Sequence, residues 1–429
     1  MTTEAAALKT VLVAGGSYAG HEAVRILSEI LPESYKIVLL ERNSHFNHVY
    51  VFPRYSVVDG HTHKAFIPYT NVFGSSLAKE SRHELIQGTL LNINPPSNTN
   101  NQGESGIATF VQNNEEKSLP FDYLIYALGS YRPGSIDLWK STYSGNKIDG
   151  IENVKEIQKS VNAAKNIVIV GSGPLGIEFA ADIADHYTGT EAKNVTLLSS
   201  STKLLPKLKD EVHQQTYTWL TQHGVNVLLG ERLAEQNQDA NGDINVKTNK
   251  GKTIQADLVL DCTGLKANTA PLKPLLGDNW LDQTPAWTND KLQLLNTSPD
   301  EPQNKIHSFD NIYIAGDAGH AFGAHKNGAN AREQAGIASR NICRQIAIIQ
   351  QQSTNPESAS WAKRFLANNG QQPELYKPGP IKIKVSLGLK DAISQGDYGV
   401  AYRKGEGRPD MNVEKHWKNR GLSTSDMHL

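Results

Sequence analysis

The chain has 429 residues, 38% of them hydrophobic, and its 43 lysines and arginines against 44 acidic residues give a formal net charge of −1. This length allows two or three domains, and the balanced charge favours neither nucleic-acid binding nor a polybasic membrane patch. The only two cysteines, Cys262 and Cys343, form no CxxC motif, which excludes zinc knuckles, iron–sulfur clusters and a dithiol centre.

The start of the chain shows no targeting or anchoring pattern. No apolar run approaches the roughly 18–20 residues that a membrane-spanning helix needs, and the first residues lack the regions of a signal peptide. Thr2 stands where N-myristoylation requires glycine. We therefore expect a cytoplasmic protein without a membrane span, for which peripheral membrane contact stays open.

Residues 10–31 have the pattern of a buried strand, a glycine turn and an amphipathic helix. The turn carries Gly15, Gly16 and Gly20, with Ser17 at the middle position of the GxGxxG motif. Such a turn brings a pyrophosphate to the N-terminus of the helix. The Ser17 side chain crowds the pyrophosphate there but can donate a hydrogen bond to it.

The next strand ends at Glu41, 21 residues after Gly20. A carboxylate at this spacing accepts hydrogen bonds from the ribose of an adenosine and repels a 2′-phosphate; the alternative is a solvated charge at a strand end. We also place the neighbouring Arg42, and Arg54 farther along, in the cofactor-binding set.

The segment that follows is rich in histidines and aromatic residues. His45 and His48 have HxxH spacing and His61 and His63 alternate, which raises the question of a metal site. No cysteine is near and few carboxylates lie at ligand spacing, so we expect no metal. We expect the aromatic residues to cover a flat ring or to join the core.

Residues 86–120 have the pattern of a β-meander, and the strand after it ends in a turn at Gly129.

The same plan then occurs a second time. Residues 167–182 read as a strand, an unbroken GxGxxG with Gly171, Gly173 and Gly176, and a helix. The first glycines of the two motifs are 171 − 15 = 156 residues apart, and a second meander leads to a strand that ends near Gly264. An ordinary glycine-rich turn is the alternative, but the repeat favours two copies of one dinucleotide-binding domain.

The second copy lacks the acidic residue of the first. Its second strand ends in Ser199 with no carboxylate, and Lys203 follows. Without an acid to reject a 2′-phosphate, this pocket is predicted to admit NADPH as well as NADH.

The C-terminal third begins with a strand over 311–315, the turn residue Asp317 and a helix rich in small residues. Asp317 either binds a hydroxyl of a flavin ribityl chain or caps the helix. Residues 350–373 are expected to be an exposed stretch, 376–387 a half-buried strand, and 388–395 a loop. The last thirty residues, with Trp417 as anchor, are either docked or partly disordered.

Eight short motifs carry a resemblance to a known family. They are GGSYAG (15–20), KAFIPY (64–69), YALGS (126–130), GSGPLGIEFAAD (171–182), CTGLKAN (262–268), IAGDAG (314–319), and YKPG with SLGLKD (within 376–391). Together they resemble flavoproteins with two dinucleotide-binding domains, within these the apoptosis-inducing-factor-like group, and there the ferroptosis-suppressor and fungal AMID-like branch.

The resemblance implies FAD in the first domain and NAD(P)H in the second. It implies that Asp317 binds the flavin, that Glu178 lies near the nicotinamide, and that the loop with Lys390 lines the acceptor pocket; we assign Glu178 and Lys390 as catalytic. Leu389 stands where the related loop has a basic residue. The family's disulfide-reducing members carry a cysteine pair after the first glycine motif, where this chain has none.

The predicted fold is therefore α/β, with two Rossmann-like domains, the second inserted in the first, and a smaller C-terminal segment. We expect the FAD domain at 1–138 and 289–350, the NAD(P)H domain at 139–288, and the C-terminal interface segment and tail at 351–429.

The predicted function is an FAD-dependent NAD(P)H oxidoreductase. It passes hydride to flavin and electrons to a quinone-like small acceptor without a redox disulfide. The alternatives are a reductase of a small electron-transfer protein and a redox-sensing or death-signalling flavoprotein with slow turnover. The acceptor, the choice between NADH and NADPH, and the choice between monomer and homodimer stay open at this level.

Overall fold

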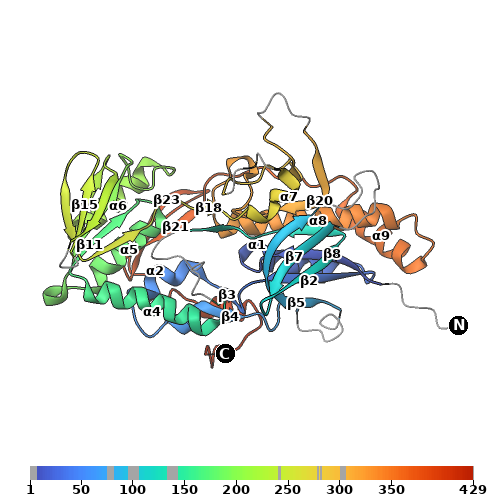
Figure 1. Cartoon of the computed structure of the whole chain (residues 1–429), viewed down its shortest axis with the longest axis horizontal. Helices are drawn as coiled ribbons and strands as arrows, with labels where there is room; N and C mark the ends of the chain where they lie inside the picture. The colour runs from blue at the N-terminus through green and yellow to red at the C-terminus, as the bar shows by residue number, and fades with distance from the viewer. Residues whose placement is uncertain are drawn as a thin grey trace. The chain divides into compact units, whose positions relative to one another are not determined.

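The computed structural model describes residues 7–74, 82–94, 106–132, 144–239, 243–277, 280, 283–299 and 306–428. The chain divides into two compact units (Figure 1). Unit 1 comprises Met1–Phe46, Pro68–Tyr131 and Lys266–Gly379; unit 2 comprises Asn47–Ile67, Arg132–Leu265 and Pro380–Leu429.

Unit 1 is built on a six-stranded sheet in the order β19-β20-β9-β1-β2-β5. Every pair in it is parallel except β19 with β20. The strands β1 and β2 are nearly continuous apolar runs, as expected of parallel strands buried on both faces. The strands are β1 (Lys9–Ala14), β2 (Tyr35–Glu41), β5 (Glu84–Gln87), β9 (Tyr123–Tyr126), β19 (Gln293–Leu295) and β20 (Ser308–Ile314).

Two long helices of unit 1, α1 (Tyr18–Ile30) and α8 (Gly328–Gln350), pack against each other and against this sheet. An antiparallel meander contributes Ile93, Phe110 and Phe121 to the same core as Leu12 and Leu40. The meander strands are β6 (Thr89–Asn94), β7 (Gly106–Gln112) and β8 (Glu115–Phe121). The other elements of unit 1 are β10 (Ser130–Tyr131), which pairs with β18 (Lys266–Ala267), η4 (Ala270–Leu272), α7 (Lys273–Leu276), η5 (Ala321–Gly323) and α9 (Pro356–Asn369).

Unit 2 repeats the plan with a four-stranded parallel sheet in the order β13-β12-β11-β17 and an antiparallel meander, β14-β15-β16. The strands are β11 (Asn166–Val170), β12 (Asn194–Ser199), β13 (Asn226–Leu229), β14 (Leu233–Gln238), β15 (Ile244–Thr248), β16 (Thr253–Ala256) and β17 (Leu258–Asp261). The helices are η1 (Val49–Val51), α2 (Phe52–Tyr55), η2 (Thr62–Ala65), α4 (Lys147–Ala163), α5 (Pro174–His186), η3 (Gly189–Glu191), α6 (Asp210–Gln222) and α10 (Glu414–Lys418).

A third sheet of unit 2 consists of β21 (Ile383–Leu387), β22 (Asp391–Gly396) and β23 (Gly399–Arg403). It packs on α5 and α6, where Val385, Leu387 and Ile393 join Phe179 and Ile183 in one core. The two short strands β3 (His45–Asn47) and β4 (Phe66–Pro68) pair with each other. No helix in the described part of the chain has the length and apolar character to cross a bilayer.

The structure confirms the predicted α/β fold with two Rossmann-like sheets. In each copy the first glycine of the turn donates its N–H to the penultimate residue of the second strand. These bonds are Gly15 N to Leu40 O and Gly171 N to Leu198 O, both 2.8 Å long. The equal register makes Glu41 and Ser199 structurally equivalent residues.

The compact units differ from the predicted domain boundaries. Residues 47–67 cluster with unit 2, and residues 266–288 cluster with unit 1, where β18 pairs with β10. Residues 351–379 also belong to unit 1, so that only Pro380–Leu429 of the predicted C-terminal segment lies in unit 2.

The stretch at 350–373 is mostly exposed or half-buried, as predicted, but most of it forms α9, a helix that the sequence reading did not predict. Asn355 caps this helix by accepting the N–H groups of Glu357 and Ser358, and Pro356 occupies its first position. Phe365 and Leu366 are buried by it. The predicted loop at 388–395 is likewise mostly strand, because β22 begins at Asp391.

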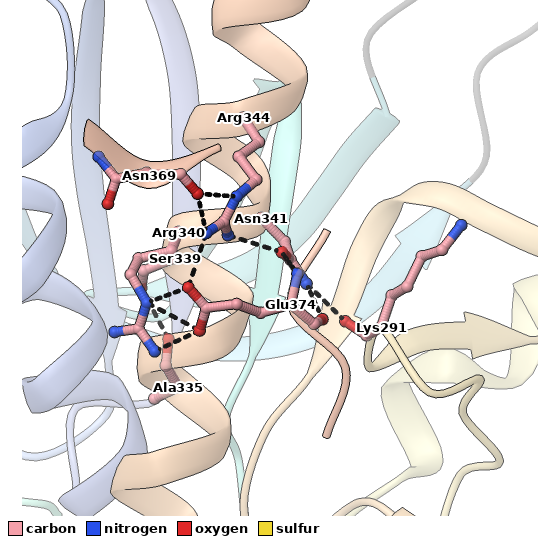
Figure 2. Close-up of polar contacts among 8 residues, drawn as sticks. All are labelled: Lys291, Ala335, Ser339, Arg340, Asn341, Arg344, Asn369 and Glu374. Atoms are coloured by element: carbon pink, nitrogen blue, oxygen red, sulfur yellow. Dashed lines mark hydrogen bonds and ion pairs between the residues drawn. The ribbon is translucent and has the colours of Figure 1, made fainter. Parts of the chain in front are cut away.

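The segment after α9 is held to α8 by a polar cluster (Figure 2). Glu374 accepts hydrogen bonds from Arg340 and Arg344 in two ion pairs of 2.7 Å each. Asn341 bonds the Glu374 backbone on both sides, since its amide donates to the carbonyl (2.9 Å) and its oxygen accepts the N–H (2.8 Å). These contacts explain why the segment belongs to unit 1.

The C-terminal tail is docked rather than disordered where the structure describes it. Trp417 is fully buried in unit 2, and its indole N–H donates to Lys64 O at 2.9 Å. The Lys147 ammonium lies 5.3 Å from the Trp417 ring centre and donates to Met427 O at 2.8 Å.

Candidate functional site

The first glycine turn is shaped by contacts that only glycine allows. Gly15 has φ +95°, and a Cβ there would lie 2.5 Å from Ala127 O. A Cβ on Gly20 would overlap Gly15 O, and one on Gly16 would lie 2.7 Å from the Tyr69 hydroxyl. These glycines are therefore required by the chain's own packing.

The second turn adds a glycine that the chain itself does not require. Gly171 has φ +113° and a Cβ on Gly176 would overlap Gly171 O, as in the first copy. A Cβ on Gly173, by contrast, would meet nothing within 4 Å.

The open space at Gly173 fits an external ligand. The residue has an ordinary φ of −75° and stands at the N-cap of α5, and Ser17 has the same place and a φ of −73° at the N-cap of α1. The unfilled space lies where a pyrophosphate approaches the N–H groups of the helix. The geometry of both turns thus suits a dinucleotide.

Glu41 ends β2 as predicted and is held in a fixed orientation. Its carboxylate accepts the Gly16 N–H at 2.5 Å and two donors of Asn43 at 2.8 and 2.7 Å. Burial raises the pKa of this carboxyl, against the lowering effect of the Gly16 and Asn43 hydrogen bonds. Its contact with a ribose stays a prediction.

Ser199, at the equivalent position of unit 2, is buried and neutral. Its hydroxyl shares a hydrogen bond of 2.6 Å with Ser172 Oγ and accepts the Ser201 N–H at 3.1 Å. The absence of an acid at this position therefore holds in three dimensions as well as in the sequence.

Asp317 follows β20 and is not a helix cap. The cap of α8 is Asn327, whose side chain accepts the Asn330 N–H. The Asp317 carboxylate instead accepts the Ser130 hydroxyl at 2.9 Å, next to Gly129 with its φ of +64°. The structure thus removes the capping alternative, and the flavin contact stays a prediction.

In unit 2 three carboxylates lie along one face of α5. Glu178, Asp182 and Asp185 have the spacing i, i+4 and i+7. Glu178 accepts the N–H and the hydroxyl of Ser386 at 3.2 and 3.3 Å, and Asp185 accepts the Leu389 N–H at 2.7 Å. Two of the acids therefore bind directly to residues 386–390, the end of β21 and the turn after it, which we call the 386–390 loop and which carries Lys390.

The third acid binds the loop through Arg54. The guanidinium makes two hydrogen bonds of 2.8 Å to Asp182 and donates to Gly388 O at 2.6 Å. It also reaches Leu389 O and Arg408 O at 3.5 and 3.3 Å. Arg54 is 2% exposed and all its donor groups are engaged within unit 2, an arrangement that favours a role in holding the loop over the predicted role in cofactor binding.

The two residues predicted to be catalytic differ in environment. Burial raises the pKa of Glu178 to about 8, an effect strengthened by Asp182 and weakened by Ser386 and Arg54. Lys390 is exposed at the end of the loop, and its carbonyl accepts the Gly407 N–H at 2.7 Å. The structure thus carries both on elements that are bonded together in unit 2.

Residues 9–335 match the sequence profile of the pyridine nucleotide-disulphide oxidoreductase family. The chain belongs to this family. It is therefore a flavoprotein oxidoreductase that uses FAD and NAD(P)H, as predicted.

Named relatives confirm the likeness that the motifs indicated. The chain is 36% identical to Fe-regulated protein 8 of Mycosarcoma maydis, over 98% of this chain and 96% of that protein. It is 26% identical to ferroptosis suppressor protein 1 of Xenopus tropicalis, over 96% of each. It is 25% identical to apoptosis-inducing factor homolog B of Dictyostelium discoideum, over 90% and 89%.

Solved structures show the same fold. NDH2 of Plasmodium falciparum in complex with NADH has a TM-score of 0.63 to this chain at 14% identity, over 98% of this chain and 96% of that one.

The cysteines of this family member are both buried and free. Cys262 follows β17 in unit 2, and Cys343 lies on α8 in unit 1. Burial raises the pKa of the Cys262 thiol to about 12 and raises that of Cys343 as well. Both thiols are therefore protonated at neutral pH and poor nucleophiles.

Arg42 and Gly264 were also predicted to bind a cofactor. Arg42 follows β2 and its carbonyl accepts an amide hydrogen of Gln87, while Gly264 lies in an exposed turn with φ +56°. Their contacts with cofactor stay predictions.

The histidine-rich segment packs against the tail in unit 2. The His48 and His416 rings are tilted against each other and His63 stacks on His428, each pair with ring centres 3.9 Å apart. Phe52, Tyr55 and Phe66 form a core cluster there. Among the described residues, no group of three or more His, Cys, Asp or Glu side chains could hold a metal ion.

Sequence reasoning missed Asp182, Asp185 and Ser386. The spacing of the three acids after the second glycine motif was a visible signal of one helix face. Their partners lie between 128 and 208 residues away in the sequence, and no local pattern connects them.

Proposed function

We propose that this oxidoreductase passes electrons from NAD(P)H, by way of FAD, directly to a quinone or a similar small acceptor. The observation that carries the proposal is the state of the cysteines. A disulfide relay needs two neighbouring thiols, whereas the chain has two cysteines in all, and they are buried in different units. When bound, FAD supplies the hydride acceptance and the onward electron transfer.

The residues of unit 2 support a proton-handling role in that reaction. Reduction of a quinone to a hydroquinone consumes two protons, one more than a hydride brings. Both donors of Ser386 reach Glu178 Oε1, so the proton that the carboxyl holds at neutral pH resides on Oε2. We assign Glu178 as the group that holds and delivers this proton.

Lys390 and the 386–390 loop support the choice of acceptor. The loop is fixed to α5 at three points, through Glu178, Asp185 and Arg54. An exposed ammonium on a fixed loop can donate a hydrogen bond to a carbonyl oxygen whose negative charge increases on reduction. We therefore propose Lys390 as the residue that orients the acceptor.

The test is steady-state oxidation of NADH by the purified yellow protein against a panel of acceptors. The panel contains a short-chain ubiquinone, oxidised glutathione, cytochrome c and dioxygen. The proposal expects the quinone to be reduced fastest and glutathione not at all. Fastest reduction of cytochrome c would overturn it in favour of a reductase of electron-transfer proteins. Negligible turnover with every acceptor, together with a change of sedimentation on adding NADH, would indicate a signalling flavoprotein.

Lys390→Gln separates binding of the acceptor from reduction of the flavin. We expect this variant to reduce the quinone more slowly than the wild type does. The rate at which NADH reduces the flavin should stay the same. That rate is measured without acceptor, from the loss of flavin absorbance near 450 nm. An equal loss of both reactions would contradict the assignment of Lys390 to the acceptor.

A further inference from the structure

In Rossmann-like domains the end of the second strand, here β12, is the place where an adenosine ribose binds. Ser199 ends this strand at the position that Glu41 has in the first copy, and Ser201 and Thr202 follow it. Gly230, just beyond β13, donates its N–H to Ser201 O at 2.9 Å. We call Ser199, Ser201, Thr202 and Gly230 the ribose rim.

A lysine from a distant part of the sequence reaches this rim. A Cβ placed on Gly230 would lie 3.8 Å from the ammonium nitrogen of Lys250 and 3.7 Å from the Thr202 methyl carbon. The Lys250 ammonium therefore lies close to the residues that follow β12. Among the residues that the structure describes, it has no carboxylate within ion-pair distance.

The backbone that carries Lys250 is fixed. It lies in the turn between β15 and β16. The buried Thr248 hydroxyl accepts the N–H groups of Lys250 at 3.3 Å and Lys252 at 3.2 Å. Gly251, with φ +83°, completes the turn. Only the side chain of Lys250 is then left to adjust to a ligand.

Two other charged residues near the rim are Lys203 and Glu231. Lys203 is paired with Asp210 at 2.5 Å. Glu231 donates its backbone N–H to Ser199 O at 2.9 Å, and its Oε2 is buried without a hydrogen-bond partner. A carboxylate at this place disfavours a phosphate, so a cation is needed for the pocket to accept one.

We infer that Lys250 binds the 2′-phosphate of NADPH at the ribose rim, where it offsets the Glu231 carboxylate and lets the pocket use NADPH beside NADH. The inference rests on the proposed assignment of the second glycine turn to the nicotinamide nucleotide. The chemistry is an ammonium facing a phosphate dianion, which makes a charge-assisted hydrogen bond. NADH presents only a hydroxyl to the same ammonium and gains little from it.

The test measures binding of NADP⁺ and NAD⁺ to the FAD-loaded protein by calorimetry, with no electron acceptor present. Lys250→Gln is expected to weaken NADP⁺ binding about tenfold, the effect of losing one charge-assisted hydrogen bond. Binding of NAD⁺ should change less than about twofold. The matched control, Lys247→Gln, removes the same charge from an exposed position of β15 and should leave both affinities unchanged.

Three results would overturn the inference: an unchanged affinity for NADP⁺, an equal loss for NADP⁺ and NAD⁺, or a loss in Lys247→Gln as large as in Lys250→Gln. The fragments 2′,5′-ADP and 5′-ADP give the same comparison without the nicotinamide, and only the first should lose affinity in Lys250→Gln. Because no acceptor takes part, these outcomes do not depend on whether the acceptor is a quinone. If neither NAD⁺ nor 5′-ADP bound the wild-type protein, the result would refute the assignment of the second glycine turn to the nicotinamide nucleotide, and with it the basis of the inference about Lys250.

Discussion

Replacing Glu178 by glutamine tests the environment of this carboxyl through a change of stability that depends on pH. The substitution keeps the shape of the side chain, and the amide oxygen can still accept the two Ser386 hydrogen bonds seen in the structure. It removes the ionisable group. Any difference in stability that varies with pH therefore reports on the ionisation of Glu178.

Whether the wild type gains or loses stability as the pH rises follows from the direction of the pKa shift of Glu178. Burial raises the pKa of the carboxyl from 4.5 to about 8. Below the unfolded-state value both states are protonated and the wild type has its full stability. As the pH rises toward 8, only the unfolded chain ionises freely, so the wild type loses free energy of unfolding. The glutamine variant has no such loss. The difference in free energy of unfolding between the variant and the wild type therefore reaches its full value above pH 8.

The size of the pKa shift of Glu178 limits how much the free energy of unfolding can change with pH. At about 1.4 kcal/mol per pKa unit, the displacement from 4.5 to about 8 sets a ceiling of about 5 kcal/mol. The side chain is only partly buried, and solvent screening reduces this to about 1–2 kcal/mol. For a protein of this size we expect the unfolding temperature of Glu178→Gln to exceed that of the wild type by about 1–2 °C at pH 9.

The assay is thermal unfolding at pH 5, 7 and 9 and constant ionic strength, with FAD saturating. Glu156→Gln, at an exposed position of α4, serves as the control and should show no gain that grows with pH. A difference between Glu178→Gln and wild type that stays constant or shrinks as the pH rises would refute the reasoning. The same variant should show slower quinone reduction if Glu178 delivers the proton.

Three further experiments with substituted proteins test the site. Asp317→Ala should purify with much less bound flavin, because a charge-assisted hydrogen bond of about 1.5–3 kcal/mol is lost; full occupancy, measured by the ratio of absorbance at 450 and 280 nm, would argue against the flavin contact. Arg54→Met leaves the buried Asp182 charge unpaired and should lower the free energy of unfolding by about 3–5 kcal/mol. The double variant with Asp182→Leu should recover much of this loss in denaturant unfolding, and no recovery would mean that the pair is not coupled. The double variant Cys262→Ser, Cys343→Ser should keep its rate of quinone reduction per bound FAD; loss of that rate with flavin reduction by NADH intact would support a thiol relay.

The sequence by itself determined the duplicated plan and the shape of both glycine turns. Gly15 and Gly171 have positive φ, and Gly20 and Gly176 have no room for a Cβ. These constraints act within each turn, and they are visible in the sequence because only glycine satisfies them. The contrast between Glu41 and Ser199 was readable for the same reason, because a strand end at a fixed spacing from a glycine turn keeps its register.

The tertiary structure decided the role of Arg54 and the identity of its partners. Arg54 and Asp182 are 128 residues apart, and Arg54 and Gly388 are 334 residues apart. A pairing over such distances depends on how α2, α5 and the 386–390 loop pack, and no local spacing encodes it. The same holds for Lys250, which reaches the ribose rim only because the β15–β16 turn folds back toward the end of β12.

The helix α9 is an intermediate case. Its signals were in the sequence, with Asn355 as cap, Pro356 at the first position and Phe365 among the core positions. The polar composition of the stretch hid them, because only a few of its side chains are buried. Which of these residues are buried is set by the surface against which the helix packs, and that surface exists only after the chain has folded.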